Sequence, residues 1–305
     1  MIKEQIILLD GGIGQEIYSR AGSPESQTLW SLQIMREDPE LVVDVHRDFI
    51  GAGSKVLSLN NYAATPSRLA RIGIPECFEE IHALAIELLY RAISKSDVSR
   101  SDLSIAGCLP PLVASYSAED NRLNKELFNE YASLIQQQID HVDLFIAETM
   151  SSMKEIMVVT DVLGHFGLKQ FISLTLDDDN PHRLRSGESL EDAIMLLEAK
   201  SVDAILLNCS CPETISLALP KFKKTNVNFG AYANGFSSVK NLKIGKSVNV
   251  LETRKDLGPS EYAEFAFDWI DQGAKIIGGC CEIGPKHIEE LSDQLSLNGY
   301  KSTKV

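Results

Sequence analysis

The chain has 305 residues, of which 44% are hydrophobic and 24% are charged, a composition typical of a globular protein with a large core. Its formal net charge is −14, from 43 acidic and 29 basic side chains, which argues against nucleic acid or an anionic membrane as the main partner. The first residues are not those of a signal peptide, no run is long enough to span a membrane, and the 6 cysteines are too sparse for a disulfide scaffold, so we expect a cytoplasmic location.

Short apolar runs alternate with helix-periodic segments along the chain. The predicted strands lie at residues 6–9, 55–60, 103–107, 142–148, 170–176, 204–208, 227–234 and 274–279. The predicted helices lie at residues 39–52, 75–94, 124–141, 153–166, 189–200, 212–223, 260–271 and 286–297, with an irregular stretch before the first. This alternation predicts an α/β fold, a single-domain (β/α)8 TIM barrel over residues 1–297.

Three further expectations accompany the barrel. Residues 298–305 are predicted to be a flexible C-terminal tail. The connections 176–188 and 234–258 are long for a barrel, which indicates functional loops. An open doubly wound sheet is the alternative fold, but the glycines at 11–14 lack the spacing of a full dinucleotide fingerprint.

Polar residues follow most of the predicted strands. In a barrel of parallel strands the active site is built at the carboxyl ends of the strands, so these residues are expected to meet. They are Asp10, Asn60, Glu148, Cys209, Asn234 and the Cys280-Cys281 pair. Loops are polar in any case, so the pattern gains its weight from the cysteines.

The vicinal Cys280 and Cys281 need an unusual backbone to serve one site, because neighbouring residues of a strand point to opposite faces. Gly278 and Gly279, directly before them, supply conformational freedom at this point. Together with Cys209, these thiols would form a three-cysteine zinc site with its fourth position open, the arrangement of a catalytic site. The alternative is that the cysteines are small buried hydrophobes.

Cys211 competes with Cys209 for a place in this set. Strand alternation puts Cys209 on the face of Leu207, whereas Cys211 lies beyond the strand and before a proline, so Cys209 is preferred. Cys77 and Cys108 are expected to be structural, and none of the histidines lies beside a cysteine motif.

Glu148 follows an apolar strand and has no basic neighbour in sequence. If it is buried it needs a cation, and a substrate ammonium would serve, whereas the alternative is a solvated loop carboxylate. Asp10 is similar, and Gly11 beside it would let backbone N–H groups approach a ligand.

The chain resembles the homocysteine S-methyltransferases, a family that includes the betaine- and S-methylmethionine-dependent enzymes. The matching motifs run almost the whole length of the chain in the family's order: Leu9-Asp10-Gly11-Gly12, Asn60-Asn61-Tyr62, Ala147-Glu148-Thr149, Asn208-Cys209 and Gly278-Gly279-Cys280-Cys281, followed by Pro285 and His287. The departures are Asn61 in place of a threonine, Ala233 in place of a proline, and Glu282 in place of a small residue.

The resemblance implies a barrel with Zn²⁺ held by Cys209, Cys280 and Cys281. It also implies that Glu148 takes the homocysteine ammonium and that the Asp10-Gly11 turn lines the amino-acid pocket. Asn60 and Asn234 are further candidate substrate contacts at strand ends. The role of Glu282 is left open, as an added negative charge near the site or as a group that faces solvent.

The implied chemistry is methyl transfer from a sulfonium donor to the homocysteine thiolate, forming methionine. A free thiol is mostly protonated at neutral pH, and coordination to zinc would ionise it, so no catalytic residue beyond the zinc-activated substrate thiolate is expected. S-Methylmethionine is the favoured donor, because the chain has no cobalamin or folate module. The tyrosines Tyr62, Tyr116 and Tyr232 and also Phe236 are candidates to cradle the donor cation, although a core role is the safer expectation for each.

The alternatives are a methyltransferase of another thiol or selenol, a betaine-type donor, and a non-catalytic zinc- or thiol-binding barrel. The expected partners are small molecules. The sequence does not indicate an oligomeric state.

Overall fold

The computed structural model describes residues 4–22, 30–118, 120–240, 242 and 250–305 of the chain. Its strands are all parallel and form one sheet in the order β2-β3-β4-β5-β6-β7-β8-β1-β9. Their bounds are β1 Gln5–Leu8, β2 Val56–Ser58, β3 Ser104–Leu109, β4 Leu144–Met150, β5 Gln170–Leu174, β6 Ala204–Asn208, β7 Asn228–Tyr232, β8 Ile276–Ile277 and β9 Lys301–Thr303.

The sheet curls so that β1 meets β2. A parallel bridge joins Leu9 to Val56, and the Asp10 N–H donates to the Val56 carbonyl at 3.0 Å. The Lys55 N–H donates to the Leu8 carbonyl at 2.8 Å, which extends the same seam. The predicted (β/α)8 barrel is therefore confirmed, and the open sheet is excluded.

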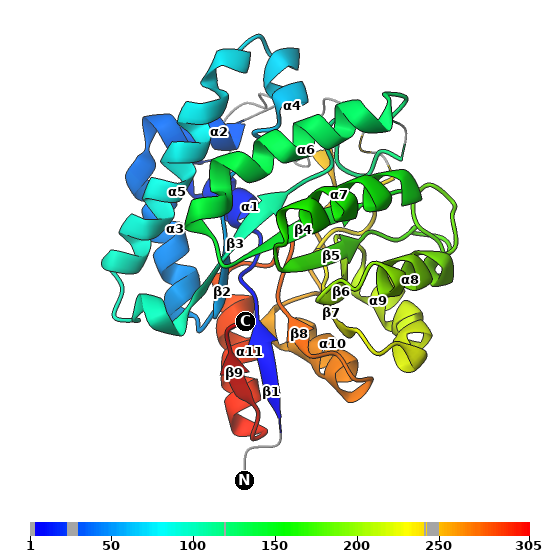
Figure 1. Cartoon of the computed structure of the whole chain (residues 1–305). Coiled ribbons are helices and arrows are strands. Elements are labelled where there is room, and N and C mark those ends of the chain that lie inside the picture. Colours follow the sequence, from blue (N-terminus) through cyan, green and yellow to red (C-terminus); the bar gives the residue numbers. More distant parts are fainter. Residues whose placement is uncertain (1–3, 23–29, 119, 241, 243–249) are drawn as a thin grey trace.

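Helices surround the barrel on its outside (Figure 1). They are α1 Ile13–Arg20, α2 Trp30–Glu37, α3 Pro39–Gly51, α4 Pro66–Arg71, α5 Phe78–Ser94, α6 Asn124–Gln138, α7 Met153–Phe166, α8 Leu190–Ala199, α9 Pro212–Ala218, α10 Pro259–Asp271 and α11 Pro285–Leu297. Several begin at a residue whose side chain accepts a backbone N–H of the first turn, as Ser152 does for α7 and Ser189 for α8. In the described part of the chain, none of the helices is long and apolar enough to cross a bilayer.

Two apolar layers hold the fold together, and strand alternation assigns residues to them. Phe145 and Ala147 of β4 belong to the large cluster between the sheet and the helices. Leu144 and Ile146 belong to a second, smaller cluster that fills the barrel interior with residues from the other strands. The next residue on the interior face of β4 is Glu148, so alternation carries this carboxylate to the top of the barrel core.

The structure differs from the sequence-based expectations at three places. The stretch predicted to be irregular contains α1 and α2, and the predicted strand 274–279 is ordered as β8 only over its two isoleucines. The prediction of a flexible tail is wrong for β9, which pairs with β1 ahead of its seam with β2, Gln5 opposite Lys301 (Figure 1). Of the long loop predicted at 234–258, residues 241 and 243–249 lie outside the described residues.

Candidate metal centre and substrate cavity

Three cysteines meet at the carboxyl end of the barrel. The sulfur atoms of Cys209, Cys280 and Cys281 all lie within 4.8 Å of one another. Cys209 and Cys280 are joined by a disulfide, and Cys281 is a free thiol. Burial, followed by the charges of Glu282 and Glu148, raises the pKa of the Cys281 thiol to about 12, so this thiol is protonated at neutral pH unless a cation binds it.

The three sulfurs lie near enough to one another to share a metal ion once the disulfide is broken. Tetrahedral zinc with Zn–S bonds of about 2.3 Å separates its sulfur ligands by about 3.8 Å, so the bonded sulfurs of Cys209 and Cys280 would have to move apart to bind it. The disulfide between Cys209 and Cys280 must be reduced before both sulfurs can act as thiolate ligands. Cys211 is outside the group, because its Sγ turns toward the Phe236 carbonyl at 3.4 Å.

Glycines allow the chain to approach itself closely around the cysteines. A Cβ atom on Gly279 would lie 2.2 Å from Ile283 Cγ2, and one on Gly12 would lie 2.5 Å from the Cys280 carbonyl oxygen. A Cβ atom on Gly278 would lie 2.5 Å from Leu9 Cβ, and none of these three glycines has a positive φ. The glycines before the cysteines are therefore required for close packing, and the interpretation that they supply conformational freedom is corrected.

A buried side-chain pair links β4 to β6 beside the cysteines. The Asn208 carboxamide accepts the Thr149 N–H at 3.1 Å and donates to Thr149 Oγ1 at 3.0 Å. Thr149 has a φ of 61° and Cys209 a φ of 47°, both in the left-handed region that non-glycine residues rarely adopt. We call these two hydrogen bonds the Asn208–Thr149 clamp; it holds the bend in the backbone after Glu148 next to the bend at Cys209.

Glu148 projects into the interior beneath this clamp. Its carboxylate accepts hydrogen bonds from Cys108 Sγ at 3.2 Å and from the Tyr232 hydroxyl at 3.2 Å. Burial raises the pKa of Glu148, and these two hydrogen bonds oppose the rise. No ion pair reaches this carboxylate from the described residues, so a cationic ligand group would favour its charged form.

Asp10 lies at the end of β1 on the same cavity. Its carboxylate accepts the Ser58 N–H at 2.6 Å and the Ser58 hydroxyl at 3.1 Å. Burial raises the pKa of Asp10 to about 7; the hydrogen bonds from Ser58 oppose this, and the nearby charge of Glu148 adds to it. The two carboxylates therefore share one low-dielectric space.

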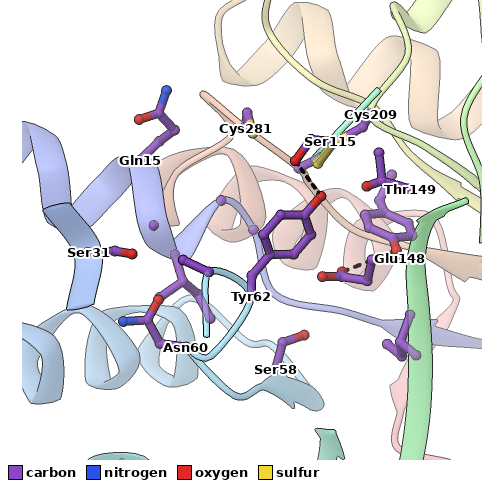
Figure 2. A pocket seen from close by; sticks show the side chains of 18 of the residues that line it. Gln15, Ser31, Ser58, Asn60, Tyr62, Ser115, Glu148, Thr149, Cys209 and Cys281 are labelled. Atoms are coloured by element: carbon purple, nitrogen blue, oxygen red, sulfur yellow. Dashed lines mark hydrogen bonds between the residues drawn. A yellow bond between two sulfur atoms is a disulfide. The ribbon is translucent and has the colours of Figure 1, made fainter. Parts of the chain in front are cut away.

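One cavity of about 240 Å³ joins these groups. Of the residues predicted from the sequence, its lining includes Asp10, Gly11, Asn60, Glu148, Cys209, Cys280 and Cys281. Figure 2 shows Tyr62 projecting into this cavity, with its hydroxyl directed at Ser115 2.9 Å away. The structure thus brings the strand-end residues together around a space large enough for a small molecule.

Two of the expected residues lie elsewhere. Asn234 is buried outside this lining, where its Oδ1 accepts the Phe236 N–H at 3.1 Å. Glu282 does not line the cavity either; its carboxylate accepts from Gln15 Nε2 at 3.0 Å and from Thr253 Oγ1 at 3.1 Å. Glu282 therefore faces a second depression behind Gly12.

The tyrosines of the cavity are already engaged by protein groups. The Arg68 guanidinium lies 5.1 Å from the ring centroid of Tyr62, and that of Arg185 lies 5.1 Å from the ring centroid of Tyr116. The Tyr232 hydroxyl bonds Ser173 Oγ as well as Glu148. Sequence reasoning named these tyrosines and expected Cys108 to be structural. It missed the hydrogen bond from Cys108 to Glu148 and the arginines of α4, because these contacts join segments that are distant in sequence.

The barrel has a polar cavity at its carboxyl end with a group of three cysteines in the lining, which defines a class: a TIM-barrel protein with a candidate metal-binding group beside a small-molecule cavity. Comparison with known proteins gives the family. The model of the homocysteine S-methyltransferase family matches residues 7–295, so this chain belongs to that family.

Named relatives agree with this assignment. Homocysteine S-methyltransferase of Escherichia coli (strain K12) is 28% identical, over 95% of each chain. Selenocysteine Se-methyltransferase of Brassica oleracea var. italica is 25% identical, over 94% of this chain and 88% of the relative. The crystal structure of the homocysteine methyltransferase MmuM from Escherichia coli in its metallated form matches with a TM-score of 0.80 at 25% identity, covering 96% of this chain and 97% of that one.

Proposed function

We propose that the protein is a zinc-dependent S-methyltransferase that makes methionine from homocysteine, with S-methylmethionine as the favoured donor. The observation that carries this proposal is a cavity lined both by the three cysteines and by two carboxylates, the buried Asp10 and the half-buried Glu148, which form no ion pair among the described residues. A thiol substrate with an ammonium group matches both features.

The thiolates of Cys209, Cys280 and Cys281 would hold the zinc, leaving one position open toward the cavity. The bound ion would ionise the homocysteine thiol and fix its sulfur. Glu148 and Asp10 would neutralise and orient the homocysteine ammonium, and Asn60 and the Gly11 backbone would line the amino-acid pocket.

In the reaction the homocysteine sulfur forms a bond to the donor methyl carbon, and the bond from that carbon to the sulfonium sulfur breaks. The electron pair of the broken bond stays on the donor sulfur, which leaves as a neutral thioether. No proton moves in this step, so no general base is required.

A cytoplasmic location is part of the proposal. The Cys209–Cys280 disulfide and a three-thiolate metal site exclude each other, so the active protein needs a reducing compartment. A second acceptor has to be considered beside homocysteine, because one relative is named for selenocysteine. A selenol would reach the same open position, so selenocysteine is the second candidate acceptor.

The test uses reduced, zinc-loaded protein. We expect about one equivalent of bound zinc and methionine formation from homocysteine with S-methylmethionine, and a slower rate with betaine or with selenocysteine as the acceptor. Cys280→Ser should lose both zinc and turnover, whereas the control Cys211→Ser should keep both, because Cys211 lies outside the cysteine group. Zinc binding without turnover for any of these donors would contradict the proposal.

A further inference from the structure

Helix α4 carries two arginines that line the same cavity, Arg68 and Arg71. Residues three apart lie on the same face of a helix, so the two guanidiniums are neighbours. The helix is anchored at its start, because Thr65 Oγ1 accepts the Arg68 N–H at 3.1 Å and donates to the Leu112 carbonyl at 2.7 Å. The two arginines are thus presented to the cavity from a fixed support.

Neither arginine forms an ion pair among the described residues, although Glu155, whose pKa is raised by burial, is near enough for the charge of Arg68 to oppose that rise. Arg68 is only 8% exposed, and its guanidinium donates to the Pro111 carbonyl at 2.7 Å and to the Tyr62 carbonyl at 3.5 Å. Its Nε has no hydrogen-bond partner among the described residues. Arg71 is exposed and donates to the Val113 carbonyl. Throughout the described ranges, neither arginine has a carboxylate within 4.0 Å.

Another buried arginine shows what a purely structural site looks like here. Arg185 forms an ion pair with Asp178 at 2.7 Å, and each side chain is 8% exposed. A buried charge normally has such a partner, because an unpaired one is costly. Arg68 is at least as deeply buried as Arg185 but has no carboxylate within 4.0 Å among the described residues, so an anionic group of a ligand would complete it.

The cavity therefore holds charges of both signs that do not pair with each other. Asp10 and Glu148 are the negative groups, and Arg68 and Arg71 are the positive ones. This separation suits molecules that carry an ammonium and a carboxylate at once. The planar fork of N–H donors on arginine matches a carboxylate well.

The position of α4 favours the methyl donor over the acceptor. This helix follows β2, which lies opposite β6 in the strand order, and β6 ends at Cys209. On the proposed function, the homocysteine sulfur lies at the cysteines, so the donor occupies the space between them and α4. The methyl group that is transferred must face the sulfur, which turns the other end of the donor toward the arginines.

We infer that Arg68 and Arg71 form a carboxylate-binding subsite for the methyl donor, which selects sulfonium or ammonium donors that carry a carboxylate. This inference rests on the proposed function for the identity of the donor. It is tested by binding, so its outcome does not depend on turnover.

The experiment measures the dissociation constants of S-methylmethionine and of its carboxamide by calorimetry, using zinc-loaded protein. Homoserine, which lacks the thiol, fills the acceptor site so that no reaction occurs. We expect the acid to bind about tenfold or more tightly than the amide, because charge-assisted hydrogen bonds are lost in the amide. In both Arg71→Gln and Arg68→Lys, the ratio of the amide to the acid dissociation constant should fall. In Arg71→Gln it should approach one.

Arg100→Gln is the matched control, since Arg100 precedes β3 at the other end of the barrel and pairs with Asp143. It should keep the wild-type ratio. Arg71 is exposed, so its variant decides the matter if the Arg68 variant folds poorly. Equal binding of acid and amide to the wild type would overturn the subsite, as would variants that weaken both ligands equally. Discrimination without turnover would support the subsite and contradict the proposed function.

Discussion

The two ends of the barrel differ in whether their charged side chains form ion pairs. At the amino ends of the strands, charged side chains form ion pairs: Arg100 pairs with Asp143 at 2.8 Å, and Lys275 pairs with Glu4. At the carboxyl ends, Asp10 and Glu148 have no ion-pair partner in the described part of the chain, although both are more deeply buried.

This difference in ion pairing indicates that the functional site lies at the carboxyl ends of the strands. Unpaired charge in a buried site is costly, and a fold keeps it where a ligand neutralises it. The paired charges at the amino ends are partly exposed and contribute little to stability individually. Replacing residues at the carboxyl end should therefore impair binding, whereas replacing their counterparts at the amino end should have little effect.

Among the substitutions that test this comparison, the largest effect on the KM for homocysteine is expected at Glu148. Glu148→Gln keeps the size of the side chain but removes the charge that would meet the substrate ammonium. We expect the KM for homocysteine to rise about 30-fold or more, with a smaller change in kcat, because a charge-assisted hydrogen bond becomes a neutral one. Steady-state kinetics checks this.

Asp161→Asn is the control for Glu148→Gln, because Asp161 is an exposed carboxylate paired with Lys200. It should leave the KM within about twofold of the wild-type value. An unchanged KM in Glu148→Gln would break the contrast between the two ends.

A smaller effect is expected from the Asn208–Thr149 clamp. Asn208→Ala leaves the buried Thr149 N–H without its acceptor, which should lower the free energy of unfolding by about 1–3 kcal/mol. Because the clamp fixes the backbone beside Glu148, the KM for homocysteine should rise about tenfold as well.

A double-mutant cycle tests the clamp directly. Adding Thr149→Val to Asn208→Ala should cost less than the sum of the single variants, since both remove one interaction. Additive losses in chemical denaturation would show that the two side chains do not act together.

The smallest effect is on the pH dependence of stability and comes from a histidine outside the cavity lining. His46 of α3 is fully buried, its ring nitrogens have no partner among the described residues, and burial lowers its pKa from 6.5 to about 4. The unfolded chain therefore binds this proton more readily, so the stability due to neutral His46 is present above pH 6.5 and is lost as the pH falls toward 4.

His46→Leu should remove this loss. Asp10 and Glu155 shift in the opposite direction, each with a pKa raised to about 7, so the wild-type profile alone mixes both signs. The difference in free energy of unfolding between variant and wild type should grow by about 1.4 kcal/mol per pH unit on acidification below 6.5, as measured by urea denaturation. A difference that is independent of pH would exclude His46 as the source.

The fold could largely be predicted because its signals are local. Eight apolar strands alternating with helices are visible in the sequence, and this alternation requires only nearest-neighbour patterns. The helix α1 was missed because it buries only Ile13 and Ile17, too few residues for a clear period. The strand β9 was missed because it exists only by pairing with β1, almost 300 residues away in sequence.

In the site, too, the features marked by local sequence patterns could be predicted, and those that depend on contacts between distant segments could not. Strand alternation grouped Cys209 rather than Cys211 with the cysteine pair, and the structure brings the same three sulfurs together; Asp10 and Glu148, chosen as strand ends, line the cavity beside them. Alternation could not show that Cys108 would donate to Glu148, since this contact joins two strands. The disulfide between Cys209 and Cys280 was also unforeseen, because it depends on a Cα–Cα distance of 5.8 Å across 71 residues of sequence.

The most direct test of the metal-activated thiolate is X-ray absorption at the zinc edge, on reduced, zinc-loaded protein with and without homocysteine. The predicted spectrum of the free protein has three sulfur ligands at about 2.3 Å, from Cys209, Cys280 and Cys281. Adding homocysteine should increase the sulfur count to four. A shell with fewer than three sulfurs, or one that homocysteine leaves unchanged, would contradict the proposal that this centre binds and activates the substrate thiol.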